Sequence, residues 1–277
     1  MKVLVTGAGG YIGKHVVKYL LDNNITVIAN DFAIKDIDNR ATIKVNNLFE
    51  IENPYEEFLK PDVCIHLAWK DGFIHNSDAH MAYLSNHYLF IDKLLKNGLK
   101  QIVVMGSMHE VGYYEGAIDE NTPCNPLSFY GIAKDSLRRS SSMLAERYDA
   151  IWQWIRAYYI YGDDKLGNSI FSKIQQAVEE GKRTFPFTSG KNKYDFIHIR
   201  DLAEMICKVA LQKQEKGIIN CCSGKPVSLG DQIEWYIKDN KFDIKLEYGI
   251  YPDRPYDSPA IWGDNSKIQK IYNNSNN

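Results

Sequence analysis

The sequence has no long apolar run and no long run of charge of one sign. Its longest apolar stretches, such as 102–105 and 209–211, are far shorter than the ~20 residues that a membrane-spanning helix needs. The 33 basic and 35 acidic residues are spread along the chain and give a formal net charge of -2. We therefore expect neither a membrane nor a nucleic acid as a partner.

The N-terminus lacks the apolar core and small-residue cleavage site of a secretory signal, because residues 1–7 run directly into a strand-and-turn pattern. Cysteines are few, odd in number and without CxxC spacing. They are Cys64, Cys124, Cys207, Cys221 and Cys222. We interpret them as reduced, buried apolar side chains and expect no metal site and a cytoplasmic location.

Strands alternate with helices over the first two thirds of the chain, which is typical of a parallel sheet covered by helices on both faces. After Gly162 the rhythm changes to a helix at 169–180, a loop and short strands. This change indicates a smaller part that faces the substrate. The expected strands are 2–6, 25–29, 63–67, 102–105 and 151–155, and the expected helices are 11–22, 83–97 and 128–148.

A glycine-rich segment, Gly7-Ala8-Gly9-Gly10-Tyr11-Ile12-Gly13, separates the first expected strand from the first expected helix. Gly7 allows a tight turn, Gly10 lets the backbone approach a pyrophosphate, and Gly13 lets helix and strand pack closely. The N-terminus of the helix then offers free N–H groups to the anion. The segment predicts a dinucleotide site, although a purely structural turn would need the same glycines.

Asp31 follows the second expected strand, where a carboxylate can accept the ribose hydroxyls and repel a 2′-phosphate. The alternative is an ordinary turn aspartate. Together with the glycines, Asp31 favours NAD as the cofactor. Lys35 and Arg40 are close enough in sequence to keep NADP open.

Tyr130 and Lys134 lie four residues apart in an expected helix, so that the phenol and the ammonium share one helix face. A free tyrosine has a pKa near ~10, and a nearby positive charge is expected to lower it. Tyr130 could then exchange a proton with a sugar hydroxyl while hydride moves to or from a nicotinamide. Taken alone, such a pair is more often an exposed helix pair.

Several segments together resemble the NAD-dependent epimerase/dehydratase family of extended short-chain dehydrogenases/reductases. The resemblance covers nearly the whole chain. The segments are 6–13, 61–68, Asp119-Glu120 ahead of 130–134, 156–162, 195–201, and Asn220 with Ser223-Gly224. The resemblance implies an α/β fold with a doubly wound parallel Rossmann sheet, a smaller C-terminal cap that binds a nucleotide-diphosphate sugar, and a homodimer.

On this resemblance, residues 1–162 and the returning segment 195–222 would form the dinucleotide-binding domain, and residues 163–194 and 223–277 the cap. The family pattern implies a catalytic set of Ser107, Tyr130 and Lys134. The implied cofactor-binding residues are Gly7, Gly10, Tyr11, Ile12, Gly13, Asp31, Leu48, Leu67, Ala68, Tyr130 and Lys134.

Ser107 is the candidate for the catalytic Ser or Thr that the family carries before the tyrosine, because the segment 107–112 keeps the Ser and Gly positions, with Val111 replacing an aromatic residue. Its hydroxyl would donate to the substrate oxygen beside Tyr130. The alternative is a serine that ends a strand and caps a turn.

Three features favour a reductase of 4-keto sugars. Met108 and His109 occupy the positions of the Asp and Glu that serve water elimination in the 4,6-dehydratases of the family. Tyr159 stands where many 4-epimerases have Asn. The segment from Arg254 onward resembles reductases that make GDP-6-deoxy hexoses.

The expected substrate-binding residues are His109, Tyr159 and Arg254. Arg254 would clamp the diphosphate with paired N–H donors, and a surface arginine is its alternative. Two departures from the family pattern, Trp69 for a small residue and Tyr194 for an arginine, indicate an unusual substrate.

The sequence therefore predicts an NAD(P)-dependent oxidoreductase that reduces the 4-keto group of a nucleotide-linked deoxy sugar through Ser107, Tyr130 and Lys134. One alternative is a nucleotide-sugar 4-epimerase that retains NAD between two half-reactions. A more distant alternative is a non-catalytic dinucleotide-sensing module, against which the intact catalytic set argues.

Overall fold

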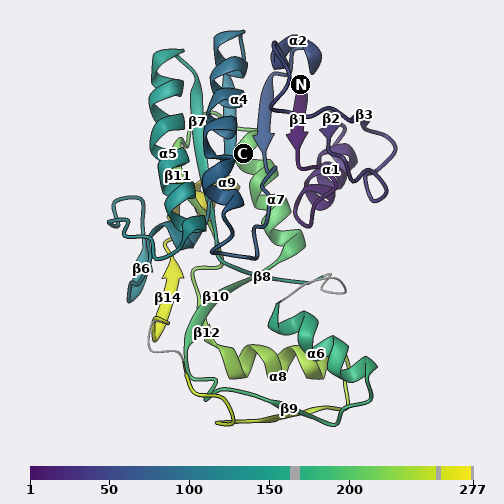
Figure 1. Ribbon diagram of the computed structural model, residues 1–277, viewed down its shortest axis with the longest axis vertical. Coiled ribbons are helices and arrows are strands. Elements are labelled where there is room, and N and C mark those ends of the chain that lie inside the picture. The colour runs from purple at the N-terminus through teal and green to yellow at the C-terminus, as the bar shows by residue number, and fades with distance from the viewer. Residues whose placement is uncertain (163–168, 254–256, 276–277) are drawn as a thin grey trace.

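A parallel sheet of seven strands forms the centre of the first part of the protein (Figure 1). The computed structural model describes residues 1–162, 169–253 and 257–275. The strands are β1 (Lys2–Thr6), β2 (Thr26–Asn30), β3 (Thr42–Lys44), β4 (Val63–His66), β5 (Gln101–Met105), β7 (Ile151–Ala157) and β11 (Gly217–Cys221). They lie in the order β11-β7-β5-β4-β1-β2-β3, and each neighbouring pair is parallel. This is the doubly wound Rossmann order that the sequence predicts.

Helices cover both faces of the sheet because successive strand residues point to opposite sides. In β1, Val3 and Val5 belong to one apolar cluster and Leu4 to another. The first cluster lies under α1 (Gly13–Asp22) and α7 (Ile199–Ala210), and the second under α4 (Leu84–Lys96) and α5 (Phe129–Arg147). Two short helices, α2 (Pro54–Glu57) and α3 (Ala79–Ala82), pack against this second pair.

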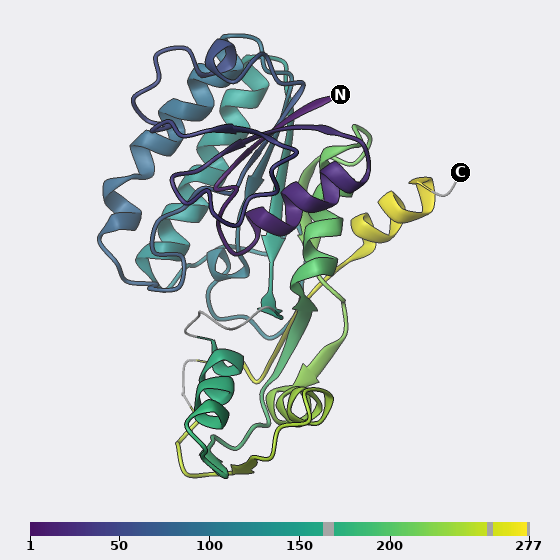
Figure 2. The same cartoon turned by 90° about the vertical axis from the view of Figure 1, so that its right-hand side faces the viewer.

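A smaller unit lies beyond one end of the sheet, and the arrowhead of β1 points toward it (Figure 1). We call this unit the cap. Its helices α6 (Ile170–Glu179) and α8 (Leu229–Asp239) lie well away from the main sheet (Figure 2). Its strands are β8 (Tyr159–Tyr161), β9 (Thr184–Pro186), β10 (Lys193–His198), β12 (Pro226–Ser228) and β13 (Lys245–Glu247), and β10 also pairs with β14 (Ala260–Gly263), which pairs with β6 (Gly116–Ile118).

The last helix packs on the main sheet and its helices, whereas the expected division assigned the whole of 223–277 to the cap. Helix α9 (Ser266–Ser275) contacts α7 and β11, and its Ile268 and Ile271 are buried in the same cluster as α1. The physical reason is the apolar stripe that these side chains form, which finds a matching apolar surface on α7. Within the described residues, none of the helices is both long and apolar enough to span a membrane.

The parallel order brings the carboxyl ends of β1, β4 and β5 to one edge of the sheet. Gly7 follows β1, Leu67 follows β4, and Ser107 comes two residues after β5. Ligands of open α/β sheets bind at this edge, where the strand order reverses. The fold therefore collects the expected site residues on the side of the sheet that faces the cap.

Replacing Gly13 by alanine tests the close packing of α1 on β1. An added Cβ would lie 2.0 Å from the Gly7 carbonyl oxygen and 2.8 Å from Ala8 Cα, so the helix must shift. We expect Gly13→Ala to lower the free energy of unfolding by about 1–3 kcal/mol, as overpacked sites do. Gly72→Ala is the matched control, because an added Cβ there meets nothing within 4 Å. Urea unfolding measures both, and equal effects of the two variants would contradict the packing argument.

Candidate active site

The glycine-rich turn after β1 has the geometry of an anion cradle. Gly7 has φ +68°, in the left-handed region that favours glycine, and the Gly10 N–H donates to the Gly7 carbonyl (3.1 Å). A Cβ at Gly10 would meet only that carbonyl oxygen within 4 Å, so this side of the turn is open. Helix α1 begins without a side-chain cap at Ile12, which leaves the helix N-terminus suited to a phosphate.

Asp31 lies at the end of β2 and ties this turn to the next loop. Its Oδ2 accepts from the Gly9 N–H and its Oδ1 from the Ala33 N–H, both at 3.0 Å. Arg40, one of the two residues that kept NADP open, pairs instead with Asp22 and Asp38. The cradle and a carboxylate at the second strand fit NAD.

The other expected cofactor residues lie at the same edge of the sheet. Leu48 is buried, Leu67 is half-buried, and the Ala68 N–H donates weakly to Thr6 Oγ1 (3.4 Å). The Tyr11 hydroxyl donates to the Gly162 carbonyl (2.6 Å) and so joins the glycine turn to the end of β8. These residues would surround a dinucleotide that lies across the turn.

Ser107 is buried and begins a 3₁₀ turn, Met108–Glu110. Its Oγ accepts from the His109 N–H (3.3 Å), while its own N–H donates to Glu110 Oε1 (2.7 Å). The serine thus caps the turn, as its alternative interpretation held, and the same geometry leaves its hydroxyl hydrogen free to donate. The Ser107 side chain also lies near enough to the Tyr130 hydroxyl to lower the pKa of the phenol, so the structure brings the two together.

Tyr130 and Lys134 both lie on the first turns of α5, which Ser128 caps by accepting from the Gly131 N–H (3.1 Å). Lys134 is only 3% exposed, and its Nζ donates to the Met105 carbonyl (2.7 Å) at the end of β5. Its ammonium lies 5.8 Å from the centre of the Tyr130 ring. The expected catalytic set of Ser107, Tyr130 and Lys134 is therefore assembled.

The expectation that Lys134 lowers the pKa of Tyr130 is wrong for this structure. Burial raises the pKa of Tyr130 to about 12, because it removes the phenolate from water, and the hydrogen bond from Ser107 offsets only part of this. Burial also lowers the pKa of Lys134 to about 7. The charge of Glu110 raises both values. The phenol is therefore held in its protonated form, which suits a proton donor.

Histidine rings surround Tyr130, and sequence reasoning missed most of them. His75 stacks on the Tyr130 ring at 5.3 Å between centroids, and His80 lies at 5.2 Å. His109, an expected substrate-binding residue, contacts His75 (4.3 Å) and Tyr130 (6.1 Å). Burial lowers the pKa of His109 to about 3, so it is neutral near pH 7. His75 and His80 belong to no motif in the sequence, and only the folded loop before α3, with α3 itself, shows their place.

The two remaining expected substrate residues have different outcomes. Tyr159 lies in the aromatic cluster of the cap, with its ring 4.2 Å from Tyr194 and 5.8 Å from Phe196. Tyr194 thus adds an apolar wall where the family pattern has an arginine. Arg254 lies outside the described residues.

The cysteines confirm the expectation of unpaired, mostly buried thiols. All five are free, four are buried, and Cys124 is half-buried. The Arg156 guanidinium donates to the Cys124 Sγ at 3.3 Å. Among the described residues, no group of His, Cys, Asp and Glu side chains has an arrangement that would hold a metal ion.

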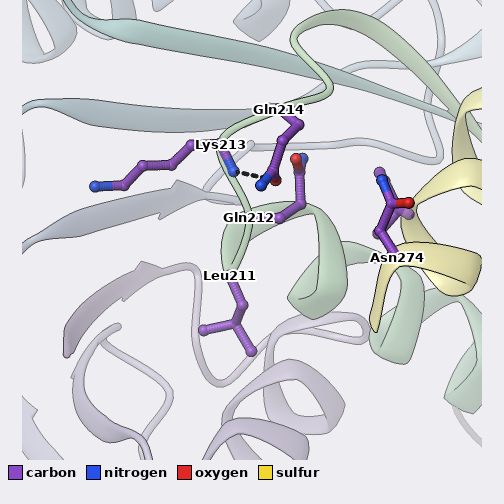
Figure 3. Close-up of a pocket in the computed structure, with 6 residues that line it drawn as sticks. Leu211, Gln212, Lys213, Gln214 and Asn274 are labelled. Carbon is purple, nitrogen blue, oxygen red and sulfur yellow. Dashed lines mark hydrogen bonds between the residues drawn. The ribbon is translucent and has the colours of Figure 1, made fainter. Parts of the chain in front are cut away.

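A cavity of about 410 Å³ lies apart from this site, between the loop after α7 and α9 (Figure 3). Its lining includes none of the expected catalytic or cofactor residues. The Lys213 N–H there donates to Gln214 Oε1 (3.4 Å), a contact within the loop itself. The lining residues are Leu211, Gln212, Lys213, Gln214, Ile271 and Asn274.

Comparison with known proteins identifies the family of the chain. The model of the NAD dependent epimerase/dehydratase family matches residues 3–222. A dTDP-6-deoxy-L-talose 4-dehydrogenase (NAD(+)) of Aggregatibacter actinomycetemcomitans is 42% identical over 269 residues, which cover 95% of this chain and 99% of that protein. A GDP-6-deoxy-D-talose 4-dehydrogenase of the same organism is 22% identical over 283 residues, which cover 99% and 92%.

Among solved structures, the UDP-glucose 4-epimerase of Thermus thermophilus in complex with NAD is similar, with a TM-score of 0.83 and 19% identity. The match covers 98% of this chain and 92% of that one. The UDP-glucose 4-epimerase of Thermotoga maritima gives a TM-score of 0.82 at 21% identity, with coverage of 98% and 92%. At these identities the likeness establishes the fold.

The buried histidines predict a loss of stability in acid. His66 accepts or donates at Thr6 Oγ1 (2.7 Å) and at His87 Nδ1 (2.9 Å), and burial lowers its pKa to about 3. In the unfolded chain the His66 ring takes up a proton as the pH falls below its ordinary pKa of ~6.5, whereas in the folded chain the ring stays neutral down to a much lower pH. His66 alone should therefore cost about 1.4 kcal/mol of unfolding free energy at about pH 5.5, and His87, with its pKa also lowered, adds to it.

Urea unfolding at about pH 7.5 and about pH 5.5 measures this loss. The variant His87→Gln keeps a hydrogen-bonding side chain but cannot titrate, so its loss between the two values should be smaller than that of the wild type. Equal stability of the wild type at both pH values would contradict the neutral histidine pair.

Proposed function

We propose that this chain, which belongs to the NAD dependent epimerase/dehydratase family, interconverts a 4-keto and a 4-hydroxyl group on a dTDP-linked 6-deoxyhexose. The protein is an NAD-dependent oxidoreductase of nucleotide sugars. The observation that carries the finer assignment is the full-length similarity to a dTDP-6-deoxy-L-talose 4-dehydrogenase at 42% identity. The set of Ser107, Tyr130 and Lys134 supports it by supplying groups that can exchange a proton at a sugar oxygen.

In the reductive direction, a nicotinamide cofactor held at the glycine turn would supply the hydride for C4 of the sugar. The Ser107 hydroxyl donates a hydrogen bond to the C4 oxygen, and the Tyr130 hydroxyl gives that oxygen its proton as the C4–H bond forms. A pKa of about 12 keeps Tyr130 protonated before the step. Lys134 is held near Tyr130 by the Met105 carbonyl, and in its charged form it would stabilise the tyrosinate that develops. In the reverse direction Tyr130 must first lose its proton.

Water elimination is disfavoured by the residues beside Ser107. Met108 is buried and has no proton to give. His109 is neutral because burial lowers its pKa to about 3, so it is a poor acid for a leaving hydroxyl. Tyr130 is therefore the proton donor of a single redox step in this proposal. The alternative is an epimerase that retains NAD, and an experiment must distinguish it from the reductase.

We also propose that the protein is a cytoplasmic homodimer. The five free cysteines fit a reducing compartment. Exposed apolar side chains on the adjacent helices α4 and α5, namely Leu89, Ile132 and Met143, support a helix-bundle interface.

Tyr130→Phe tests the assignment of the proton donor. We expect NAD binding to stay within about threefold of the wild type and turnover to fall by about 10²-fold or more, because the ring remains and the proton is lost. The assay follows nicotinamide absorbance and product identity with dTDP-4-keto-6-deoxyhexoses and NADH. Tyr148→Phe is the matched control, since Tyr148 caps the other end of α5 and donates to Asp92 (2.9 Å).

Turnover by Tyr130→Phe close to the wild-type rate would exclude Tyr130 as the donor. Conversion of one dTDP-sugar epimer into another without net use of NADH would replace the reductase with the epimerase. Consumption of NADH in a one-to-one ratio with a 4-keto sugar supports the proposal.

A further inference from the structure

Trp69 stands directly against the catalytic lysine. The Lys134 Nζ lies 3.6 Å from the centre of the indole ring, within the range of a cation–π contact. Both residues are withdrawn from solvent, with Lys134 only 3% exposed and Trp69 half-buried. A desolvated contact of this kind is stronger than one on the surface.

The indole is held on its other side and at its edge by two histidines. His87 stacks on Trp69 with 4.5 Å between centroids and 16° between planes. The Trp69 Nε1–H donates to His80 Nδ1 (3.0 Å), while His80 Nε2 contacts the Ile74 carbonyl (2.9 Å). One His80 nitrogen accepts from the indole and the other can donate to the Ile74 carbonyl, which is the pattern of a neutral imidazole.

His87 is held in turn by His66 and, through His66, by Thr6 of β1. His87 Nδ1 contacts His66 Nε2, and His66 Nδ1 contacts Thr6 Oγ1, so three elements fix one ring. Burial of both rings, and to a smaller extent the charge of Lys134, lowers the pKa of His66 and His87. His66 and His87 therefore stay neutral, and among the residues that the structure describes Lys134 is the cation that lies over the indole.

We infer that Trp69 is a positioning residue that fixes the Lys134 ammonium beside Tyr130 through its indole face. Two contacts then define the position of the ammonium, the Met105 carbonyl (2.7 Å) and the ring. The contact also favours the charged form of Lys134, against the burial that disfavours it. Only the kinetic part of the inference rests on the proposed function, because the charge state of Lys134 is measurable without substrate.

The titratable groups that face Lys134 determine which charges can affect its pKa. Glu110 raises its pKa, while His66, His87 and Tyr130 are neutral near pH 7. Removing the indole thus takes one favourable contact from the Lys134 ammonium and leaves the charged groups around the ammonium in place.

Titration of Lys134 in protein labelled with ¹³C-lysine tests the inference, with Lys134→Met assigning the resonance. We expect Trp69→Leu to lower the pKa of Lys134 by about 0.5–1.5 units, the equivalent of a desolvated cation–π contact. Trp69→Phe keeps an aromatic face and should lie between Trp69→Leu and the wild type. An unchanged titration in folded Trp69→Leu would overturn the inference.

Trp152→Leu is the matched control for a lost indole. Trp152 also packs against the cluster under α4 and α5, and its indole N–H donates to Ser141 Oγ (3.0 Å). We expect this variant to leave both the titration of Lys134 and the turnover near wild type. An equal fall of the Lys134 pKa in Trp152→Leu would show a general loss of packing and overturn the specific role of Trp69.

The kinetic arm uses the assay with dTDP-4-keto-6-deoxyhexose and NADH. Trp69→Leu should lower kcat about tenfold with little change in KM for the sugar, and Trp69→Phe should restore part of it. Equal kcat in Trp69→Leu and the wild type would overturn the catalytic importance of the contact. If the wild type turns over none of the sugars, the proposed function fails while the Lys134 titration still decides the inference.

Discussion

The buried carboxylate of Glu110 is the group on which the geometry of the active site depends. Its Oε1 accepts from the Ser107 N–H (2.7 Å) and the Trp154 indole (2.8 Å), and its Oε2 faces the Arg156 guanidinium (3.3 Å). Neither charged side chain of this pair is exposed. Burial of an ion pair is costly unless its hydrogen bonds are satisfied, and here they are. The satisfied pair fixes the turn after β5 and with it the position of the Ser107 hydroxyl.

The same carboxylate sets the electrostatics of the pair on α5. It raises the pKa of Tyr130 and of Lys134, so it favours the protonated form of each. Burial acts with Glu110 on the phenol and against it on the ammonium. The result is a firmly protonated Tyr130 and a Lys134 with a pKa of about 7. This balance explains why a second stabilising contact, the Trp69 ring, matters for the ammonium.

Sequence reasoning reached the features that are local in the chain and missed those that depend on distant contacts. The Gly7 turn, Asp31 and the Tyr130 helix face follow from spacing within one strand–helix unit, and their roles in binding and catalysis stay predictions. The place of Trp69 against Lys134 joins elements 65 residues apart, from the loop after β4 to α5, and no spacing rule reports it. The pKa of Tyr130 was misjudged for a related reason, because helix spacing shows the neighbouring charge but not the burial that outweighs it.

The neutral and aromatic residues around Tyr130 restrict the possible reactions more than the set of Ser107, Tyr130 and Lys134 does. The same Ser, Tyr and Lys can serve reduction, epimerisation or the first step of a dehydration, so the set alone leaves the reaction open. Elimination needs a further acid beside the sugar, and Met108 and a neutral His109 occupy that place. Under the proposed function, Tyr130 is thus the group that gives the C4 oxygen its proton. A site of this kind fits one hydride step and one proton transfer, which is what the proposed 4-keto reduction requires.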